Sequence, residues 1–377
     1  MNFDTQDYCY MAEALKLAEK GRYSTHPNPR VGCLIVNDNA VVGRGWHKQA
    51  GGPHAEIEAL NEAGDQANGA TCYVTLEPCC HYGRTGPCVK ALIEMGIKRV
   101  VIAMEDPNPQ VFGEGIAQLT SAGVQVQVGL MREQSQNLNK GFISRMQRKR
   151  PYVRCKLAMS IDGRTAMASG ESQWITGPEA RADVQRLRGQ SDAIITGCGT
   201  VLTDEPSMQV RWQELEAAGD LELPLEKHDQ PMRVVFDSQL KVSPRAKIFS
   251  PPGVTLVVTS ETSSDRYIAY ENRGISVEAF PAKKGVDIQG VLTYLSQRQI
   301  NEVLLEAGST LSGAFLQAQM VDEVVIYMAS TLMGSSAKPL FELPIDTMGK
   351  AVSLEIQEIT AVGQDWRISA YPRYCET

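Results

Sequence analysis

Apolar residues along the chain follow two spacings, one typical of amphipathic helices and one typical of buried strands. In residues 1–150, turn residues such as Gly21, Gly64 and Gly96 close the helical segments. The pattern predicts helices over 7–20, 55–63, 89–95 and 116–122, and strands over 31–36, 41–43, 71–75, 99–104 and 124–128. Because strands and helices alternate, we expect an α/β layer fold.

The remainder of the chain repeats this alternation. It predicts strands over 152–157, 193–196, 233–236, 255–258, 303–306 and 323–328, and helices over 178–188, 288–297 and 310–318. The segment 212–230 is rich in Glu, Leu and Pro and is expected to be a surface loop. The basic run 144–150 precedes Pro151, which would stop a helix, so we expect two domains, 1–148 and 149–377.

Composition narrows the class of protein. Of the 377 residues, 43% are hydrophobic and 21% are charged, which is ordinary for a globular protein and excludes a disordered tail or a coiled coil. No apolar run is long enough for a membrane span, and the first residues do not resemble a signal peptide. The net charge is −7 and the first half is near neutral, so nucleic acid is not an expected partner. The odd number of cysteines, 9, favours reduced thiols in the cytoplasm.

The clearest chemistry lies in the first half, where His54 and Glu56 precede Cys79 and Cys88. One imidazole and two thiolates suit zinc, and three protein ligands leave a fourth position for water, as in catalytic sites. Zinc lowers the pKa of such a water to near neutrality. Glu56 lies two residues after His54 at a predicted helix start, where its carboxylate can carry a proton from the water to a leaving amine.

This pattern matches the zinc nucleobase-deaminase signature, in which two residues separate the cysteines, whereas eight separate Cys79 from Cys88. Cys80 or His81 as a fourth ligand would make the site structural instead of catalytic. Buried thiols without a metal are a further alternative. Asn28 is either a turn residue before Pro29 or a group that hydrogen-bonds a pyrimidine edge, and His47 is either a substrate contact or a surface residue.

The second half lacks the glycine fingerprint of a Rossmann dinucleotide fold. Two glycine-containing turns, 197–200 and 308–310, nevertheless follow predicted strands, and their N–H groups can bind phosphate. Either one is equally consistent with a tight turn. Arg188 and Arg211 are candidate clamps for a sugar phosphate, or else surface ion-pair residues.

Several motifs resemble the pyrimidine deaminases of riboflavin biosynthesis, which many bacteria fuse to a reductase. In the first half these are N-P-R-V-G at 28–32, H-A-E at 54–56 and T-L-E-P-C-C-H-Y-G-R-T-G-P-C at 75–88, so the long cysteine spacing is the family's own. In the second half they are K-L-A-M-S-I-D-G-R at 156–164, S-Q-W-I-T-G at 172–177, G-C-G-T-V-L-T-D-E-P at 197–206 and E-A-G-S-T-L-S-G-A-F at 306–315. Ile161 stands where leucine is commoner.

The resemblance implies a cytidine-deaminase-like three-layer domain followed by a dihydrofolate-reductase-like domain that uses NADPH. It implies zinc bound by His54, Cys79 and Cys88, with Glu56 catalytic. The implied cofactor contacts are Ala158, Trp174, Thr200, Asp204, Ser238, Gly308, Ser309, Thr310, Leu311, Ser312, Gly313 and Ala314. The implied substrate contacts are Ser172, Arg188, Met208, Arg211 and Glu306. Lys156 and Asp162 are further polar candidates, and Asp162 and Glu306 are the candidate proton donors of the reduction.

These implications describe a bifunctional enzyme. Hydrolytic deamination of a phosphorylated ribosylaminopyrimidine would precede reduction of its ribosyl group to a ribityl chain. The expected partner is a small molecule, and neither nucleic acid nor a membrane is expected to bind. Whether the protein forms a homo-oligomer is left open. The alternatives are a nucleic-acid editing deaminase, a deaminase whose second half only binds a ligand, and a zinc-stabilised scaffold.

Overall fold

The computed structural model describes residues 3–80, 86–109, 111–262 and 265–374. Two compact units make up the chain. The first comprises Met1–Lys149 together with Leu221–His228, and the second comprises Arg150–Asp220 together with Asp229–Thr377. No helix among the described residues is long and apolar enough to cross a membrane.

The first unit contains a five-stranded sheet with the order β2-β1-β3-β4-β5. β1 pairs antiparallel with β2 and β3, whereas β3, β4 and β5 are parallel. The strands are β1 (Gly32–Asn37), β2 (Ala40–Trp46), β3 (Thr71–Val74), β4 (Arg99–Ile102) and β5 (Gln125–Val128). The helices are α1 (Thr5–Glu19), α2 (Ala55–Ala63), α3 (Cys88–Glu94), α4 (Glu114–Ser121), α5 (Arg132–Leu138) and α6 (Lys140–Arg148).

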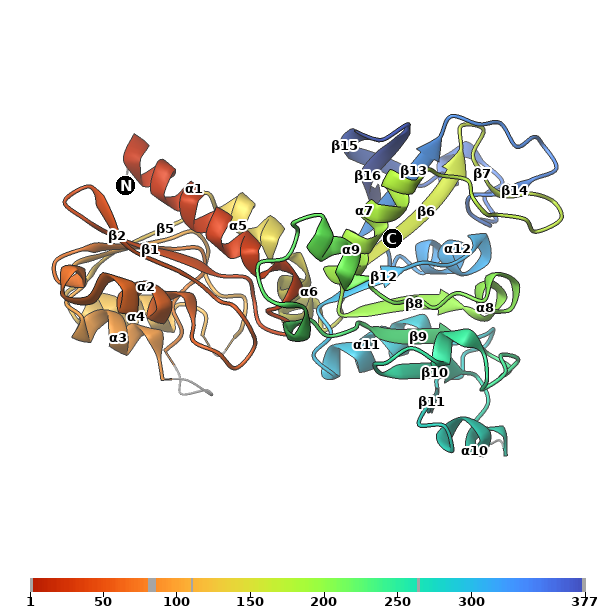
Figure 1. The fold of residues 1–377 in the computed structure, drawn as a ribbon, viewed down its shortest axis with the longest axis horizontal. Helices are drawn as coiled ribbons and strands as arrows, with labels where there is room; N and C mark the ends of the chain where they lie inside the picture. Colours follow the sequence, from red (N-terminus) through yellow and green to blue (C-terminus); the bar gives the residue numbers. More distant parts are fainter. Residues whose placement is uncertain (1–2, 81–85, 110, 263–264, 375–377) are drawn as a thin grey trace. The chain divides into compact units, whose positions relative to one another are not determined.

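Helices cover both faces of this sheet (Figure 1). Successive strand residues point to opposite faces, so each strand supplies two cores. Cys33, Ile35 and Val74 pack with α2, α3 and α4, whereas Leu34 and Tyr73 pack with α1. The first unit is therefore a three-layer α/β/α structure, and the predicted fold class is confirmed.

The second unit contains a nine-stranded sheet with the order β11-β10-β9-β8-β12-β6-β13-β16-β15. The strands from β11 to β13 are parallel, and the β15–β16 hairpin adds antiparallel to β13. Their bounds are β6 (Tyr152–Ser160), β8 (Ala193–Gly197), β9 (Met232–Phe236), β10 (Thr255–Thr259), β11 (Ser276–Ala279), β12 (Glu302–Leu305), β13 (Glu323–Ala329), β15 (Ser353–Val362) and β16 (Asp365–Arg373). β7 (Arg164–Ala166) and β14 (Lys338–Pro339) form a separate pair.

Helices also cover both faces of the larger sheet. α11 (Ile288–Gln297) and α12 (Ser309–Gln317) pack on one apolar core, and α7 (Pro178–Gly189) and α10 (Arg266–Glu271) pack on the other. The remaining helices are the short α8 (Cys198–Asp204) and α9 (Trp212–Ala217). The α/β prediction is thus confirmed for this unit as well.

Every predicted helix and strand occurs, with ends shifted by a few residues. The surface-loop prediction for 212–230 is wrong in part, because this segment contains α9, in which Trp212 and Leu215 are buried. The pattern also missed α5, α6, α8, α10, β11, the short β7–β14 pair and the β15–β16 hairpin. α5 is mostly polar and buries only Ser135, so it shows no clear apolar period. The alternation of Trp366, Ile368 and Ala370 along β16, by contrast, was overlooked.

Candidate metal centre and nucleotide site

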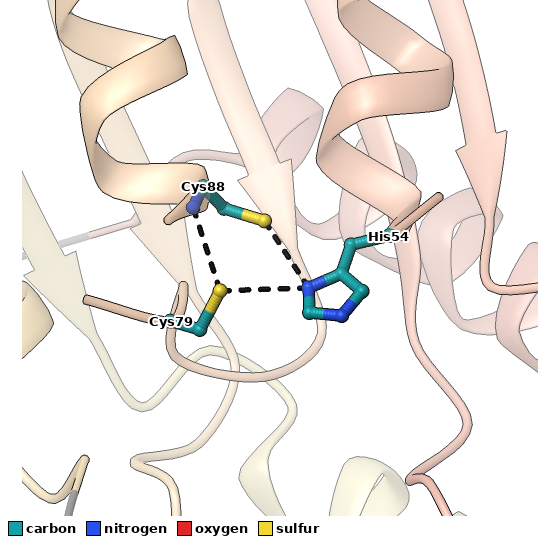
Figure 2. A group of neighbouring side chains, drawn as sticks. All are labelled: His54, Cys79 and Cys88. Carbon is teal, nitrogen blue, oxygen red and sulfur yellow. Dashed lines mark hydrogen bonds between the residues drawn. The ribbon is translucent and has the colours of Figure 1, made fainter. Parts of the chain in front are cut away.

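Three side chains from separate segments meet in the first unit (Figure 2). His54 is the residue before α2, Cys79 lies in the loop after β3, and Cys88 is the first residue of α3. His54 Nδ1 is 3.5 Å from Cys79 Sγ and 3.3 Å from Cys88 Sγ. The backbone N–H of Cys88 also points at Cys79 Sγ, 3.4 Å away. Helix starts therefore supply two of the three groups.

The spacing of these atoms fits a tetrahedral zinc ion. A nitrogen and a sulfur bound at usual zinc distances lie about 3.6 Å apart, close to both His54–cysteine distances. His54 Nδ1 is therefore the imidazole atom that would face the ion. Among the described residues, no further His, Cys, Asp or Glu joins the cluster, and Cys80 stays outside it. His81, the other proposed fourth ligand, lies outside the described residues.

The ionisation of the three cluster side chains favours a bound cation. The thiol of Cys88, its backbone N–H and His54 lower the pKa of Cys79 to about 4, because all three stabilise the thiolate. The same contact raises the pKa of Cys88, so without a metal the two sulfurs share one proton. The hydrogen bond to Cys79 raises the pKa of His54. A divalent cation would displace these protons.

Glu56 stands in the first turn of α2 and is 3% exposed. Burial raises the pKa of its carboxyl to about 7, and the charge of Cys79 adds to this effect. A carboxyl that gains and loses a proton near neutral pH suits general acid–base catalysis. Its neighbours include His54 and Cys88, two of the three residues of the cluster.

Asn28 and His47 belong to one hydrogen-bonded chain. His47 Nδ1 lies 2.9 Å from the carbonyl oxygen of Pro53, which can only accept, so Nδ1 carries the hydrogen. The Asn28 amide nitrogen then donates to His47 Nε2 over 3.0 Å. His47 is 3% exposed and its ring lies edge-on to His54, so the surface reading of His47 is wrong.

Two acidic residues near the cluster were not singled out from the sequence. Glu77 and Asp106 are both buried, and burial raises the pKa of Asp106 to about 7, with smaller contributions from Glu77 and Cys79. Asp106 follows β4, which is parallel to β3. Because the carboxyl ends of neighbouring parallel strands meet at one edge of the sheet, the E-D-P-N-P run at 105–109 is the signal that could have drawn attention to it.

In the second unit, the proposed cofactor and substrate residues gather at the carboxyl edge of the parallel strands. Thr200 follows β8, Ser238 follows β9, and Glu306 and Gly308 follow β12. β9, β8 and β12 are consecutive neighbours in the sheet. This edge is where open α/β sheets bind ligands.

Arg188 and Glu306 form a buried ion pair, with hydrogen bonds of 2.6 and 3.0 Å. Arg188 also donates to the carbonyl of Gln209 and contacts Met208 Sδ. Arg211, by contrast, is about half exposed and pairs with Glu214 on the surface. Arg211 is therefore the better placed of the two arginines to take up a phosphate from solvent.

Neither proposed proton donor of the reduction holds a proton readily. Burial opposes ionisation of Glu306, but Arg188 keeps its pKa below the usual value. A hydrogen bond from Ser160 and the N–H groups of Met333 and Gly334 lower the pKa of Asp162 to about 2. Both groups are carboxylates at neutral pH, which argues against either as the acid.

Residues 309–314 form the first turns of α12, and Gly308 is the residue immediately before the helix. The hydroxyls of Ser309 and Thr310 donate to the carboxylate of Glu342 over 3.3 and 2.9 Å. A Cβ on Gly313 would lie 2.3 Å from the carbonyl oxygen of Glu342, so that position has no room for a side chain. Glu342, which the sequence pattern did not indicate, thus contacts the start of α12.

The remaining predicted residues differ in exposure. Ser172 donates to Asp204 over 3.4 Å, so these two lie together. Trp174 is 70% exposed, with the Arg181 guanidinium 4.6 Å above its ring. Ala158 lies on β6 opposite Tyr327 of β13. The open face of Trp174 is available for stacking on a flat ring.

The chain was compared with known proteins. Residues 4–104 match the family model described as the cytidine and deoxycytidylate deaminase zinc-binding region, and residues 151–368 match the RibD C-terminal domain. The riboflavin biosynthesis protein RibD of Escherichia coli K12 is 49% identical over 96% of this chain and 98% of its own length. RibD of Haemophilus influenzae is 44% identical over 99% of both chains.

Solved structures agree with these relatives. RibD of Acinetobacter baumannii is 42% identical, covers 98% of this chain and 99% of its own, and superposes with a TM-score of 0.90. A Thermotoga maritima protein described as a diaminohydroxyphosphoribosylaminopyrimidine deaminase and 5-amino-6-(5-phosphoribosylamino)uracil reductase is 30% identical, with coverages of 98% and 99% and a TM-score of 0.86. The chain belongs to the RibD family, the bifunctional deaminase–reductases of riboflavin biosynthesis.

Proposed function

We propose that the first half removes ammonia from 2,5-diamino-6-(5-phosphoribosylamino)pyrimidin-4-one, and that the second half reduces the ribosyl group of the product with NADPH. The observation that carries the first step is the cluster of His54, Cys79 and Cys88 beside buried Glu56. In this proposal the deaminase domain spans residues 1–148 and the reductase domain spans residues 149–377.

In the deaminase half, His54 Nδ1 and the two thiolates would hold the metal. A zinc ion with an open position activates water as a nucleophile near neutral pH. Glu56, whose buried carboxyl changes protonation state near pH 7, would carry a proton from the attacking water to the leaving amine. Asn28, whose amide is held by His47, would orient the pyrimidine edge.

In the reductase half, the starts of α8 and α12, at 197–200 and 308–314, would hold the cofactor. Ala158, Trp174, Asp204 and Ser238 would be further contacts. Ser172, Met208, Arg211 and the Arg188–Glu306 pair would surround the sugar phosphate. NADPH supplies the hydride, and these residues orient cofactor and sugar. The N–H groups at the start of α12 suit a phosphate, which supports this assignment.

The proposed location is the cytoplasm, because metal-binding thiolates must stay reduced. A small phosphorylated pyrimidine is the proposed partner. A nucleic-acid editing deaminase would instead need a basic groove with interleaved aromatic residues. A second half that only binds a ligand would not oxidise NADPH.

The test is a coupled assay with the diaminopyrimidine ribotide and NADPH, in wild type and Glu56→Gln. The variant should retain zinc and should reduce the deaminated substrate, but it should release no ammonia. Ammonia release by the variant at the wild-type rate would contradict the role of Glu56. NADPH oxidation that is absent even with the deaminated substrate would contradict the second half of the proposal.

A further inference from the structure

Glu77 is a buried carboxylate that the proposed reaction does not use. It lies in the loop between β3 and Cys79, two residues before that metal-binding cysteine, and is 3% exposed. A buried carboxylate is costly unless its oxygens are hydrogen-bonded or it is paired with a cation. Among the described residues, no basic side chain forms an ion pair with Glu77.

Backbone N–H groups take the place of that cation. Glu77 Oε2 accepts from Asp106 at 3.2 Å and from Gly113 at 3.0 Å. Glu77 Oε1 accepts from Gly115 at 3.0 Å and from Ile116 at 3.3 Å. All four donors belong to one stretch, residues 106–116, which enters α4. The negative charge therefore joins this stretch to the cysteine loop by charge-assisted hydrogen bonds.

A second contact shows how closely the two stretches approach each other. A Cβ on Gly115 would lie 2.3 Å from the carbonyl oxygen of Pro78, the residue before Cys79. The start of α4 thus lies directly on the backbone of the cysteine loop, with room only for glycine. The N–H of Glu77 also donates to the carbonyl of Met104 over 3.0 Å.

The joined stretch also includes a second buried acidic group, Asp106. Asp106 is buried, and the charge of Cys79 acts on its carboxyl. Its Oδ1 accepts from the N–H of Asn108 over 2.8 Å, which shapes the loop after β4. A shift of the 106–116 stretch would therefore move both the support of Cys79 and a buried acidic group beside it.

We propose that Glu77 is a positioning residue of the deaminase: its carboxylate fixes Cys79 and the Asp106 loop in the arrangement that deamination requires. The proposal rests on the proposed function of the zinc cluster. Glu77 does not touch the reacting atoms and acts through the backbone of 106–116. This role differs from stabilisation of the fold. Under the proposal, Glu77 sets the rate of deamination in enzyme that is already folded and loaded with zinc.

The test compares Glu77→Gln with Glu94→Gln in the full chain loaded with zinc. The Glu77→Gln substitution keeps the shape of the side chain but removes its charge and presents an NH2 group to N–H donors. Loss of charge-assisted hydrogen bonds predicts a fall in the deamination kcat of at least about tenfold, with a smaller change in KM. Glu94 lies on α3, is exposed and pairs with Lys90, so Glu94→Gln should leave kcat within about twofold.

A second variant, Gly115→Ala, keeps the carboxylate but forces the two stretches apart. It should also lower kcat for deamination, with zinc content and reductase activity close to wild type. Reduction of the deaminated substrate by the same chain measures the amount of folded second unit, and zinc content reports the folding of the first unit. A wild-type kcat in Glu77→Gln would overturn the proposal, as would a loss of activity that only follows a loss of zinc. If wild type itself released no ammonia, the proposed function would fail instead.

Discussion

The buried pair of Arg188 and Glu306 gives a prediction whose size follows from its surroundings. The two side chains are only 14% and 8% exposed. Lys156 lies near enough for Glu306 and Arg188 to act on its pKa, which burial lowers. One carboxylate therefore compensates two buried cations. Glu306→Gln would leave both cations without a counter-charge.

Removal of one partner of a buried pair costs about 3–5 kcal/mol of folding free energy. For a unit of this size, each kcal/mol lowers the melting temperature by about 2–4 °C. Glu306→Gln should therefore lower the melting temperature of the reductase unit by about 6–20 °C, as measured by scanning calorimetry. It should also slow the reduction, because Arg188 loses the group that orients it.

The control is Glu214→Gln, which breaks the exposed pair with Arg211 and should cost less than about 1 kcal/mol. The double variant Arg188→Met with Glu306→Gln removes both charges and should recover part of the lost stability. The reasoning would be refuted if Glu306→Gln were no less stable than Glu214→Gln, or if the double variant lost the sum of the two single losses.

Three further predictions concern other parts of the molecule. Gly45→Ala would place a Cβ 2.0 Å from the carbonyl oxygen of Ala55 and push α2 outward; chelator competition should show weaker zinc binding, with unchanged reductase activity as the control. Arg99 lowers the pKa of Asp7, so this pair stabilises the fold above the ordinary Asp pKa, and the stabilisation is lost as the pH falls through the lowered value. Urea unfolding should therefore show Asp7→Asn to be less stable at neutral pH, and equal stabilities there would contradict this account. Arg211→Gln should raise the KM of the reductase for its phosphorylated substrate at least about tenfold with little change in melting temperature, and an unchanged KM would exclude a phosphate contact.

Much of the fold was predictable because apolar spacing is a local property. The predicted strands, such as β4, β8 and β12, carry apolar runs, and each occurs with its ends shifted by a few residues. α5 was missed for the same reason, because it is mostly polar and buries only Ser135. The β15–β16 hairpin was missed although Trp366, Ile368 and Ala370 alternate along β16.

The metal cluster was also predictable in part. The spacing of His54, Glu56, Cys79 and Cys88 identified the candidate ligands and the candidate base, since each type of side chain has a narrow chemistry. Asp106 and Glu77 were not identified as neighbours of the cluster. Their importance depends on burial and on contacts with distant backbone, which no local pattern reports.

The amino-acid sequence by itself determined which chemistry is available: an imidazole, a carboxyl and one thiol near predicted helix starts, a second thiol in a loop, and glycine residues after strands. Only the tertiary structure decided which atom of His54 faces the cysteines, that Glu56 is buried and so titrates near neutral pH, and that Arg188 is held by Glu306 while Arg211 stays exposed. The reason is physical. Residue type and local spacing are written along the chain, whereas desolvation and charge pairing arise when segments far apart in the sequence pack together.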